Sequence, residues 1–405
     1  PQEVDQFLRH YWEIKNIHFD YYFFRENCSF RLLAMLDVAR ENINMSQDAH
    51  PFYAIPVDTV RDIEAAGLVG ARNYRPSAYN KILQMTEHVG DEAAQAAIAL
   101  SQNKLTIDAM AQQFSINQQI NILQLTDEYL KQDETTSIEK SDMQINILSA
   151  RSRLDAQPED IIFAFKGVKP ETSHQTARWQ FSAGNFRASD SGLLNQRNEF
   201  GYYEIGLRPA FHDLLDVPTG FIRGSAITVF DTQFRWVPEQ DKISLNALNF
   251  FSLQSIVPIQ PWDSSASKKV SFKLKQRNIN VDNQFTEFEM QYSIGYATEL
   301  SDFLVYAMAK TQFEYAKSLK DNHGFYAGLD AGLLWVFDTT LASGQMTFNY
   351  QLLAQITGEP SDIQKLNLGV QFNLFQNNAL RLEYEKTEYD VFETTEAKLS
   401  YLIYF

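Results

Sequence analysis

The chain has 405 residues, of which 44% are hydrophobic and 13% aromatic, and its formal net charge is -16. This length allows two or three domains, and the negative charge argues against a nucleic-acid partner, which would need a basic surface. No apolar run approaches the roughly 20 residues of a transmembrane helix. The single cysteine excludes an intrachain disulfide. The chain opens at Pro1 without a signal peptide, so we expect a mature protein or a fragment.

Residues 1–85 are predicted to form a small α+β domain. His18–Phe24 is strand-like, and a helix is expected after Asn27 because apolar residues follow at helical spacing. Asn27 is a good N-cap. Residues 86–156 form a helical segment, with helices predicted at Ala93–Leu100, Thr106–Phe114, Asn117–Leu130 and Met143–Leu154 and a polar break at Asp133–Ser141.

Cys28 stands where a strand is expected to end and a helix to begin. The free N–H groups at a helix N-terminus favour an anion, and the thiolate is the nucleophilic form of cysteine. Cysteine hydrolases and acyltransferases place their nucleophile in this way, and they also need a base and a group that orients it. A buried cysteine that only packs under the helix is the alternative.

The run Tyr21–Leu33, with Asn27-Cys28 at its centre, resembles the Asn-Cys motif of a bacterial periplasmic family. That family includes the N-terminal domain of the Lnb-type lipoprotein N-acyltransferases. The resemblance covers roughly residues 1–85 and implies a circularly permuted, papain-like thiol fold. It implies that Cys28 is the nucleophile and that the histidine base lies tens of residues upstream. Only 27 residues precede Cys28, so we expect that position to be missing here.

The histidines that are present are therefore the candidates for the base. His10 and His18 lie upstream of Cys28, and His50 and His88 lie downstream. His174 stands at the mouth of the first predicted barrel strand, where the same family often shows a histidine, and it either lines a site or is a polar residue at a water interface. Glu26 and Asn27 could orient a partner, although a helix cap is the simpler role for Asn27. We take Cys28, Asn27, His18 and His174 as the candidate catalytic residues.

From about residue 157 to Phe405 the sequence alternates between apolar and polar residues with period 2, which is typical of strands with two different environments. We expect about twelve strands, each near the ~10 residues that a tilted membrane strand needs. The clearer runs are Val270–Leu274, Phe288–Tyr296, Phe303–Tyr315, Phe325–Phe337, Met346–Leu352, Leu366–Leu374, Leu380–Glu385 and Ala397–Phe405; the weaker ones lie near Ala177–Ala183, Tyr203–Leu207, Gly224–Trp236 and Ile243–Phe251.

The aromatic residues on the apolar faces favour an antiparallel transmembrane β-barrel over a soluble β-domain. The terminal Phe405 resembles the C-terminal strand signal of bacterial outer-membrane barrels. If Phe405 is periplasmic, Gln376–Asn378 and Glu299–Asp302 are short periplasmic turns, and the longer outer loops are Lys317–Gly324, Thr357–Gln364 and Lys386–Thr394. Phe211–Arg223 and Gln260–Lys268 are long for periplasmic turns and count against this registration. Ile161–Phe165 is a candidate approach strand.

The charged residues on the polar faces are expected to form charge ladders that fill the lumen rather than a selectivity filter: Lys273, Lys275, Lys310, Arg381, Glu383 and Glu385. No cysteine, histidine or carboxylate cluster has metal-ligand spacing, and no cofactor motif occurs, so neither a metal nor a cofactor is expected.

These features predict an outer-membrane protein with its N-terminal domain in the periplasm. The first hypothesis is a cysteine acyltransferase or hydrolase that acts on lipid or lipoprotein acyl groups, a substrate that only the resemblance implies. The second is a barrel that serves as a pore, transporter or scaffold, and the third is a cell-wall thiol peptidase. Outer-membrane lipids are the expected partners, with lipoproteins and peptidoglycan as further candidates.

Overall fold

The computed structural model describes residues 1–48, 53–132, 138–156, 161–165, 169–190, 199–278, 284–340 and 342–405. The chain divides into two compact units. The first contains residues 1–70, 168–258 and 266–405, and the second contains residues 71–167 and 259–265. No helix among the described residues is both long and apolar enough to cross a bilayer.

In the N-terminal part of the first unit, the described residues form four helices: α1 (Gln2–Ile14), α2 (Cys28–Ala39), α3 (Met45–Asp48) and α4 (Pro56–Ala65). The helix predicted after Asn27 is α2. The strand predicted at His18–Phe24 is wrong, because these residues form no strand. A strand needs a neighbour for its backbone N–H and C=O groups, and the described part of residues 1–70 offers none.

The second unit is a helical bundle of α5 (Ala78–Val89), α6 (Asp91–Ser101), α7 (Ile107–Gln113), α8 (Ile116–Gln132) and α9 (Ile138–Arg153). Its core is formed mainly by alanines of α6 against the apolar face of α8. Trp262, from the long connection between two barrel strands, packs against this core and stacks on Tyr129 with ring centroids 5.5 Å apart. The four predicted helices are confirmed. Of the predicted polar break, Ile138–Ser141 is helical and residues 133–137 lie outside the described residues.

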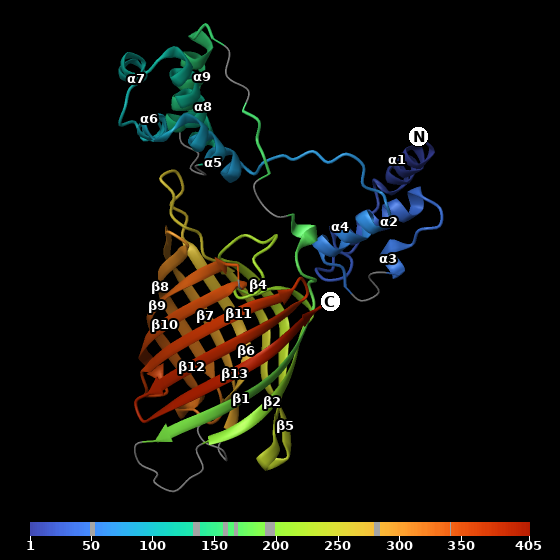
Figure 1. The fold of residues 1–405 in the computed structure, drawn as a ribbon, viewed down its shortest axis with the longest axis vertical. Coiled ribbons are helices and arrows are strands. Elements are labelled where there is room, and N and C mark those ends of the chain that lie inside the picture. Colours follow the sequence, from blue (N-terminus) through green and yellow to red (C-terminus); the bar gives the residue numbers. More distant parts are fainter. Residues whose placement is uncertain are drawn as a thin grey trace. The chain divides into compact units, whose positions relative to one another are not determined.

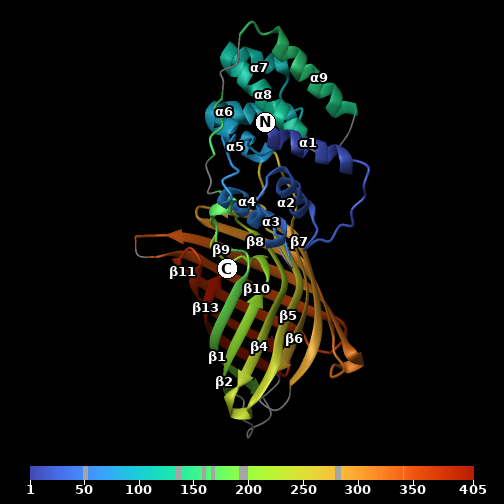
Figure 2. The same ribbon diagram turned by 90° about the vertical axis from the view of Figure 1, so that its right-hand side faces the viewer.

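The barrel consists of antiparallel strands that close into a cylinder (Figure 1). Its strands are β1 (Arg178–Asp190), β2 (Glu199–Arg208), β3 (Ala210–His212), β4 (Ser225–Val237), β5 (Lys242–Ser255), β6 (Ser267–Asn278), β7 (Gln284–Leu300), β8 (Phe303–Tyr315), β9 (His323–Asp338), β10 (Ser343–Gly358), β11 (Ile363–Phe375), β12 (Asn378–Tyr389) and β13 (Phe392–Tyr404). Apart from β2 and β3, consecutive strands pair with each other, β1 pairs with β13, and β2 pairs with β4 (Figure 2). The short β3 continues β2 beyond Pro209, so twelve long strands form the wall, as predicted.

The exposure of the side chains distinguishes the outer face of the barrel wall from the face that lines the lumen. Leu329 on β9 is 59% exposed, whereas its neighbour Asp330 is 2% exposed. The same inversion holds on β2 and β13, where Ile205 and Leu399 are exposed while Glu204 and Ser400 are buried. Apolar residues therefore cover the outside and polar residues fill the inside, which is the pattern of a barrel surrounded by lipid.

The connections at the two ends confirm most of the predicted registration. Ser301–Asp302 and Gln376–Asn377 are short turns at the end where Phe405 lies. The outer loop predicted at Lys386–Thr394 is wrong, because β12 and β13 pair through Thr387 and Thr394. Lys386 forms ion pairs with Glu388 and Glu393, so charged residues continue the hairpin. Ile161–Phe165 forms no strand.

Candidate functional site

Cys28 is the first residue of α2, and its side chain is exposed. The cap is formed by Asn27, whose Oδ1 accepts hydrogen bonds from Phe30 N at 3.1 Å and from Ser29 Oγ at 2.7 Å. The Asn27 amide also donates to Phe23 O and to Ala54 O, at 3.1 and 2.7 Å. Asn27 therefore fixes where the helix starts and holds it against the chain before α4. Its contacts are those of a positioning residue for Cys28.

Arg61 of α4 fastens the N-terminal helices to the segment that leads into the barrel. Its guanidinium is surrounded by hydrogen-bond acceptors. Nε donates to Glu171 O at 3.0 Å. The two Nη atoms donate, at 2.6–3.1 Å, to Asp58 Oδ1, Gln175 Oε1, Ser173 O, Ser173 Oγ and His174 O. Asp58 in turn accepts from Thr176 Oγ1 at 2.5 Å. We call Arg61, Asp58 and residues 171–176 the clamp.

A second contact joins the chain just before Cys28 to the barrel. The Phe23 ring lies 6.5 Å from Phe211, and the Phe24 ring lies 6.1 Å from Phe230. Phe230 is an exposed residue of β4, the strand on which Trp236 and Phe234 are also exposed. The segment that presents Cys28 is therefore held at the barrel as well as through the clamp.

The predicted catalytic residues are not all brought together. No hydrogen bond or ion pair joins Cys28 to a histidine within the described part of the chain. His18 is exposed on the segment before Cys28, and His10 lies 3.6 Å from Glu13 on α1. His88 belongs to α5 of the second unit, and His50 lies outside the described residues.

His174 is only 1% exposed and packs between two aromatic rings at the barrel mouth. Its ring lies 4.2 Å from Tyr404 and 5.1 Å from Phe221. Nδ1 lies 2.6 Å from Gln175 O, so it carries the hydrogen that this carbonyl accepts. Burial lowers the pKa of His174, although the nearby Asp216 carboxylate acts in the opposite direction. His174 is therefore neutral at neutral pH, with a packing role at the junction.

We expect His174 to make the junction sensitive to acid. In the unfolded chain it takes up a proton below its ordinary pKa of 6.5, whereas the lowered pKa in the folded chain opposes protonation. The free energy of unfolding should therefore fall as the pH drops below 6.5 towards the lowered value, with no effect of this group above 6.5. His174→Phe keeps a ring in place but cannot take up a proton. Between neutral and mildly acidic pH, its free energy of unfolding, measured by denaturant titration, should therefore fall less than that of the native chain. Equal losses in both proteins would contradict this assignment.

Arg61→Ala is expected to release the N-terminal helices from the barrel. The substitution leaves the Asp58 carboxylate without its ion pair and several carbonyl groups without a donor, at a cost of about 3 kcal/mol. Hydrogen exchange should become faster in α4 and in residues 171–176 and stay unchanged in the barrel strands. Arg9→Ala is the matched control, because the Arg9–Asp5 pair is exposed on α1. Exchange in α4 that is equally slow in both variants would show that the clamp contributes little.

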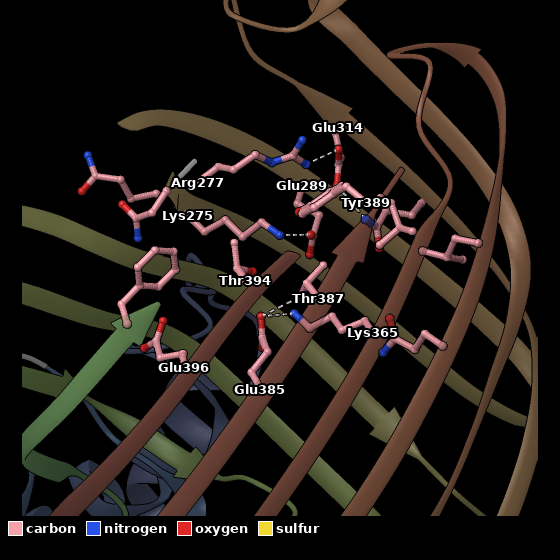
Figure 3. Close-up of a pocket in the computed structure, with 17 residues that line it drawn as sticks. Lys275, Arg277, Glu289, Glu314, Lys365, Glu385, Thr387, Tyr389, Thr394 and Glu396 are labelled. Carbon is pink, nitrogen blue, oxygen red and sulfur yellow. Dashed lines mark hydrogen bonds and ion pairs between the residues drawn. The ribbon is translucent and has the colours of Figure 1, made fainter. Parts of the chain in front are cut away.

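Inside the barrel, charged side chains form ion pairs (Figure 3). Lys275 lies 2.6 Å from Glu289, Arg277 lies 2.5 Å from Glu314, and Lys365 lies 2.8 Å from Glu385. Glu287, Glu289 and Glu314 could together offer carboxylate oxygens to a metal ion. Lys273, Lys275 and Arg277 already contact these three carboxylates, however, and supply the positive charge that a metal would bring.

Two groups of residues escaped the prediction from sequence. One is the clamp, which joins positions more than a hundred residues apart. The other is a cluster at the periplasmic end of the lumen, in which Arg178, Arg208 and Arg381 surround Asp213 and Asp216. Its signals in the sequence were the length of the Phe211–Arg223 segment and the expected lumenal position of Arg381.

The fold and the site define an outer-membrane β-barrel protein that carries a periplasmic domain at its N-terminus. Residues 1–66 match the family model described as "Lnb N-terminal periplasmic domain", and residues 72–160 match "Domain of unknown function (DUF7842)". The chain belongs to the family described as "Domain of unknown function (DUF7840)", whose model matches residues 167–404. No curated protein matches the chain.

Among solved structures, the NanC porin has 6% identity and a TM-score of 0.33, over 56% of this chain and 99% of the porin. The β-domain of the Bordetella autotransporter BrkA has 12% identity and a TM-score of 0.32, over 57% and 100%. The COG4313 outer membrane channel from Pseudomonas putida F1 has 9% identity and a TM-score of 0.33, over 62% and 100%. Scores this low carry no argument about function, and the fold is established by the strand pairing described above.

Proposed function

We propose that this protein is an outer-membrane-anchored cysteine acyltransferase or hydrolase that acts on lipid or lipoprotein acyl groups. The observation that carries the proposal is the exposed Cys28 at the first position of α2, in a segment fastened to the barrel. The match of residues 1–66 to the Lnb N-terminal periplasmic domain supports it. The barrel would hold the thiol close to membrane lipids and lipoproteins, which are the proposed partners.

The proposed reaction has two steps. The Cys28 thiolate attacks the carbonyl carbon of an acyl ester, the bond to the alcohol oxygen breaks, and the alcohol leaves with a proton while an acyl-thioester remains on Sγ. An amine or a water molecule then attacks the thioester, gives a proton to the base, takes the acyl group and releases the thiolate.

The reaction needs a base that accepts the thiol proton. Of the two histidines predicted for this role, we propose His18, because it is exposed on the segment that leads to Cys28. His174 suits the role less well, because its side chain is buried against two aromatic rings and Nδ1 is bound to a backbone carbonyl. Asn27 would act by positioning Cys28.

A pore is the alternative function, and the polar lumen favours it. Cavities of about 350 and 420 Å³ lie inside the barrel and are lined by lysine, glutamate and asparagine side chains. A cell-wall thiol peptidase is a third candidate, which would use the same nucleophile on peptidoglycan.

Capture of the acyl-enzyme tests the proposal. The full chain in detergent is incubated with phospholipids that carry a labelled acyl chain, and the tryptic peptides are analysed by mass spectrometry. Because Cys28 is the only cysteine, a hydroxylamine-labile acyl adduct can be assigned to it. Its appearance supports the acyltransferase, and His18→Gln should slow its formation. If only peptidoglycan peptides give an adduct, the peptidase is correct, and if no acyl donor labels Cys28, the enzyme proposal fails.

A further inference from the structure

The loop that joins β3 to β4, residues 213–224, extends across the lumen. Leu215 lies over Gly369 of β11, where an added Cβ would come within 2.5 Å of Leu215 Cδ1. Leu214 packs against a cluster that includes Tyr306 of β8 and Leu334 of β9. Gln345 of β10 donates a hydrogen bond to Asp216 O. A loop that begins at β3 therefore contacts the wall formed by β8 to β11.

Three arginines from the strands β1, β2 and β12 form ion pairs with this loop. Arg208 of β2 lies 2.6 Å from Asp216, Arg178 of β1 lies 2.6 Å from Asp213, and Arg381 of β12 lies 2.8 and 2.9 Å from the two aspartates. Arg208 and the Asp216 side chain are fully buried. We call these five residues the latch.

The latch needs no ligand from solution to balance its charge. Asp231 of β4 lies 3.3 Å from Arg178, so three carboxylates, of which Asp216 is fully buried, face three buried guanidiniums. Tyr404 donates a further hydrogen bond to Asp216 Oδ1 at 2.5 Å. Removing one partner of a buried ion pair leaves the other charge uncompensated, which is strongly destabilising, so these contacts favour the observed position of the loop.

The outer face of the loop is covered by the segment that Arg61 grips. Gly220 has a positive φ of 82°, and a Cβ there would lie 3.0 Å from Pro170 Cα and from Ser173 Cβ. Phe221 packs on the His174 ring. Only glycine fits this approach without strain, so the loop is held between the latch and the clamp.

We propose that the loop of residues 213–224 is a plug that closes the periplasmic end of the lumen, so that solutes pass only when it leaves its seat. It reaches strands on both sides of the barrel, and its own Asp213, Leu214 and Leu215 line the cavity of about 350 Å³. This inference does not depend on the chemistry of Cys28. It predicts that the native barrel conducts no ions while the loop is in its observed position.

Conductance of the full chain in planar lipid bilayers tests the plug. The native protein should show no lasting open steps. A variant in which residues 214–221 are replaced by a short Gly-Ser linker should conduct in steady steps. Gly369→Leu, which fills the seat of Leu215 and leaves the latch charges unchanged, should raise the open probability by about a hundredfold. Heat-dependent migration on gels confirms that each barrel is folded.

Gly201→Leu is the matched control, because a Cβ at Gly201 on β2 meets no atom closer than 4.0 Å. It should stay as silent as the native protein, and so should Cys28→Ser. A native protein that conducts as freely as the linker variant would overturn the proposal. A folded linker variant that stays silent would overturn it as well, because the lumen would then be closed by its wall side chains.

Discussion

Cys28→Ser is expected to lower the rate of acyl transfer by about a thousandfold or more, because loss of a covalent nucleophile costs factors of this size. Serine keeps the shape of the side chain, but its hydroxyl stays protonated and attacks an ester carbonyl poorly without a base in contact. The substitution should leave the fold unchanged, since the thiol is exposed and makes no hydrogen bond within the described residues. Release of a labelled acyl chain from phospholipid measures the rate.

Ser29→Ala is the control for Cys28→Ser. Ser29 is the next residue of α2 and binds the cap residue Asn27, yet it has no role in the proposed reaction. We expect its loss to change the rate less than about tenfold, the effect of one neutral hydrogen bond. If Cys28→Ser retains the native rate while Ser29→Ala loses it, the nucleophile has been assigned to the wrong residue.

The barrel could be predicted from sequence because its signal is local. Each wall strand alternates between lipid and lumen, so runs such as Leu366–Leu374 show the period within a few residues. Two local predictions were wrong: the outer loop at Lys386–Thr394 and the strand at His18–Phe24. The β12–β13 hairpin extends through charged residues, because Lys386 pairs with Glu388 on its own strand and with Glu393 on β13 in place of a lipid contact. His18–Phe24 is apolar enough for a strand but has no strand to pair with among the described residues of the N-terminal part.

The clamp and the latch could not be predicted, because each joins residues that are distant in sequence and share no pattern. Arg61 meets residues 171–176, and Asp213 meets Arg381. A lumen-facing arginine looks the same in the sequence whether it pairs with a wall carboxylate or with a loop. The position of Cys28 was visible, because a helix cap lies within three residues of it, but the partner of its thiol was not.

The clamp and the plug loop meet at one segment. Residues 169–174 carry the backbone that Arg61 grips on one side and the ring on which Phe221 packs on the other. If the Arg61 contacts are lost, residues 169–174 should therefore pack less tightly on Phe221, while the three arginines of the latch still bind Asp213 and Asp216. The N-terminal helices and the loop in the lumen are thus coupled mechanically through a short segment of backbone.

Arg208→Gln is expected to destabilise the folded barrel by about 3 kcal/mol, because it removes the guanidinium that lies 2.6 Å from the buried Asp216 carboxylate. Asp216→Asn alone should cost a similar amount, since it leaves Arg208 with a longer contact of 3.2 Å to Asp213. The double variant Arg208→Gln with Asp216→Asn should recover about 1 kcal/mol or more relative to the sum of the single losses, because both charges disappear together. Urea titration of the protein in lipid vesicles, followed by tryptophan fluorescence, measures each free energy of unfolding.

Arg187→Gln is the control, because Arg187 is 70% exposed and lies 4.0 Å from Glu199, so its loss should cost at most about 1 kcal/mol. Additive losses in the double variant would show that Arg208 and Asp216 do not act as a pair, and the plug would then have to be held by Arg178 and Arg381.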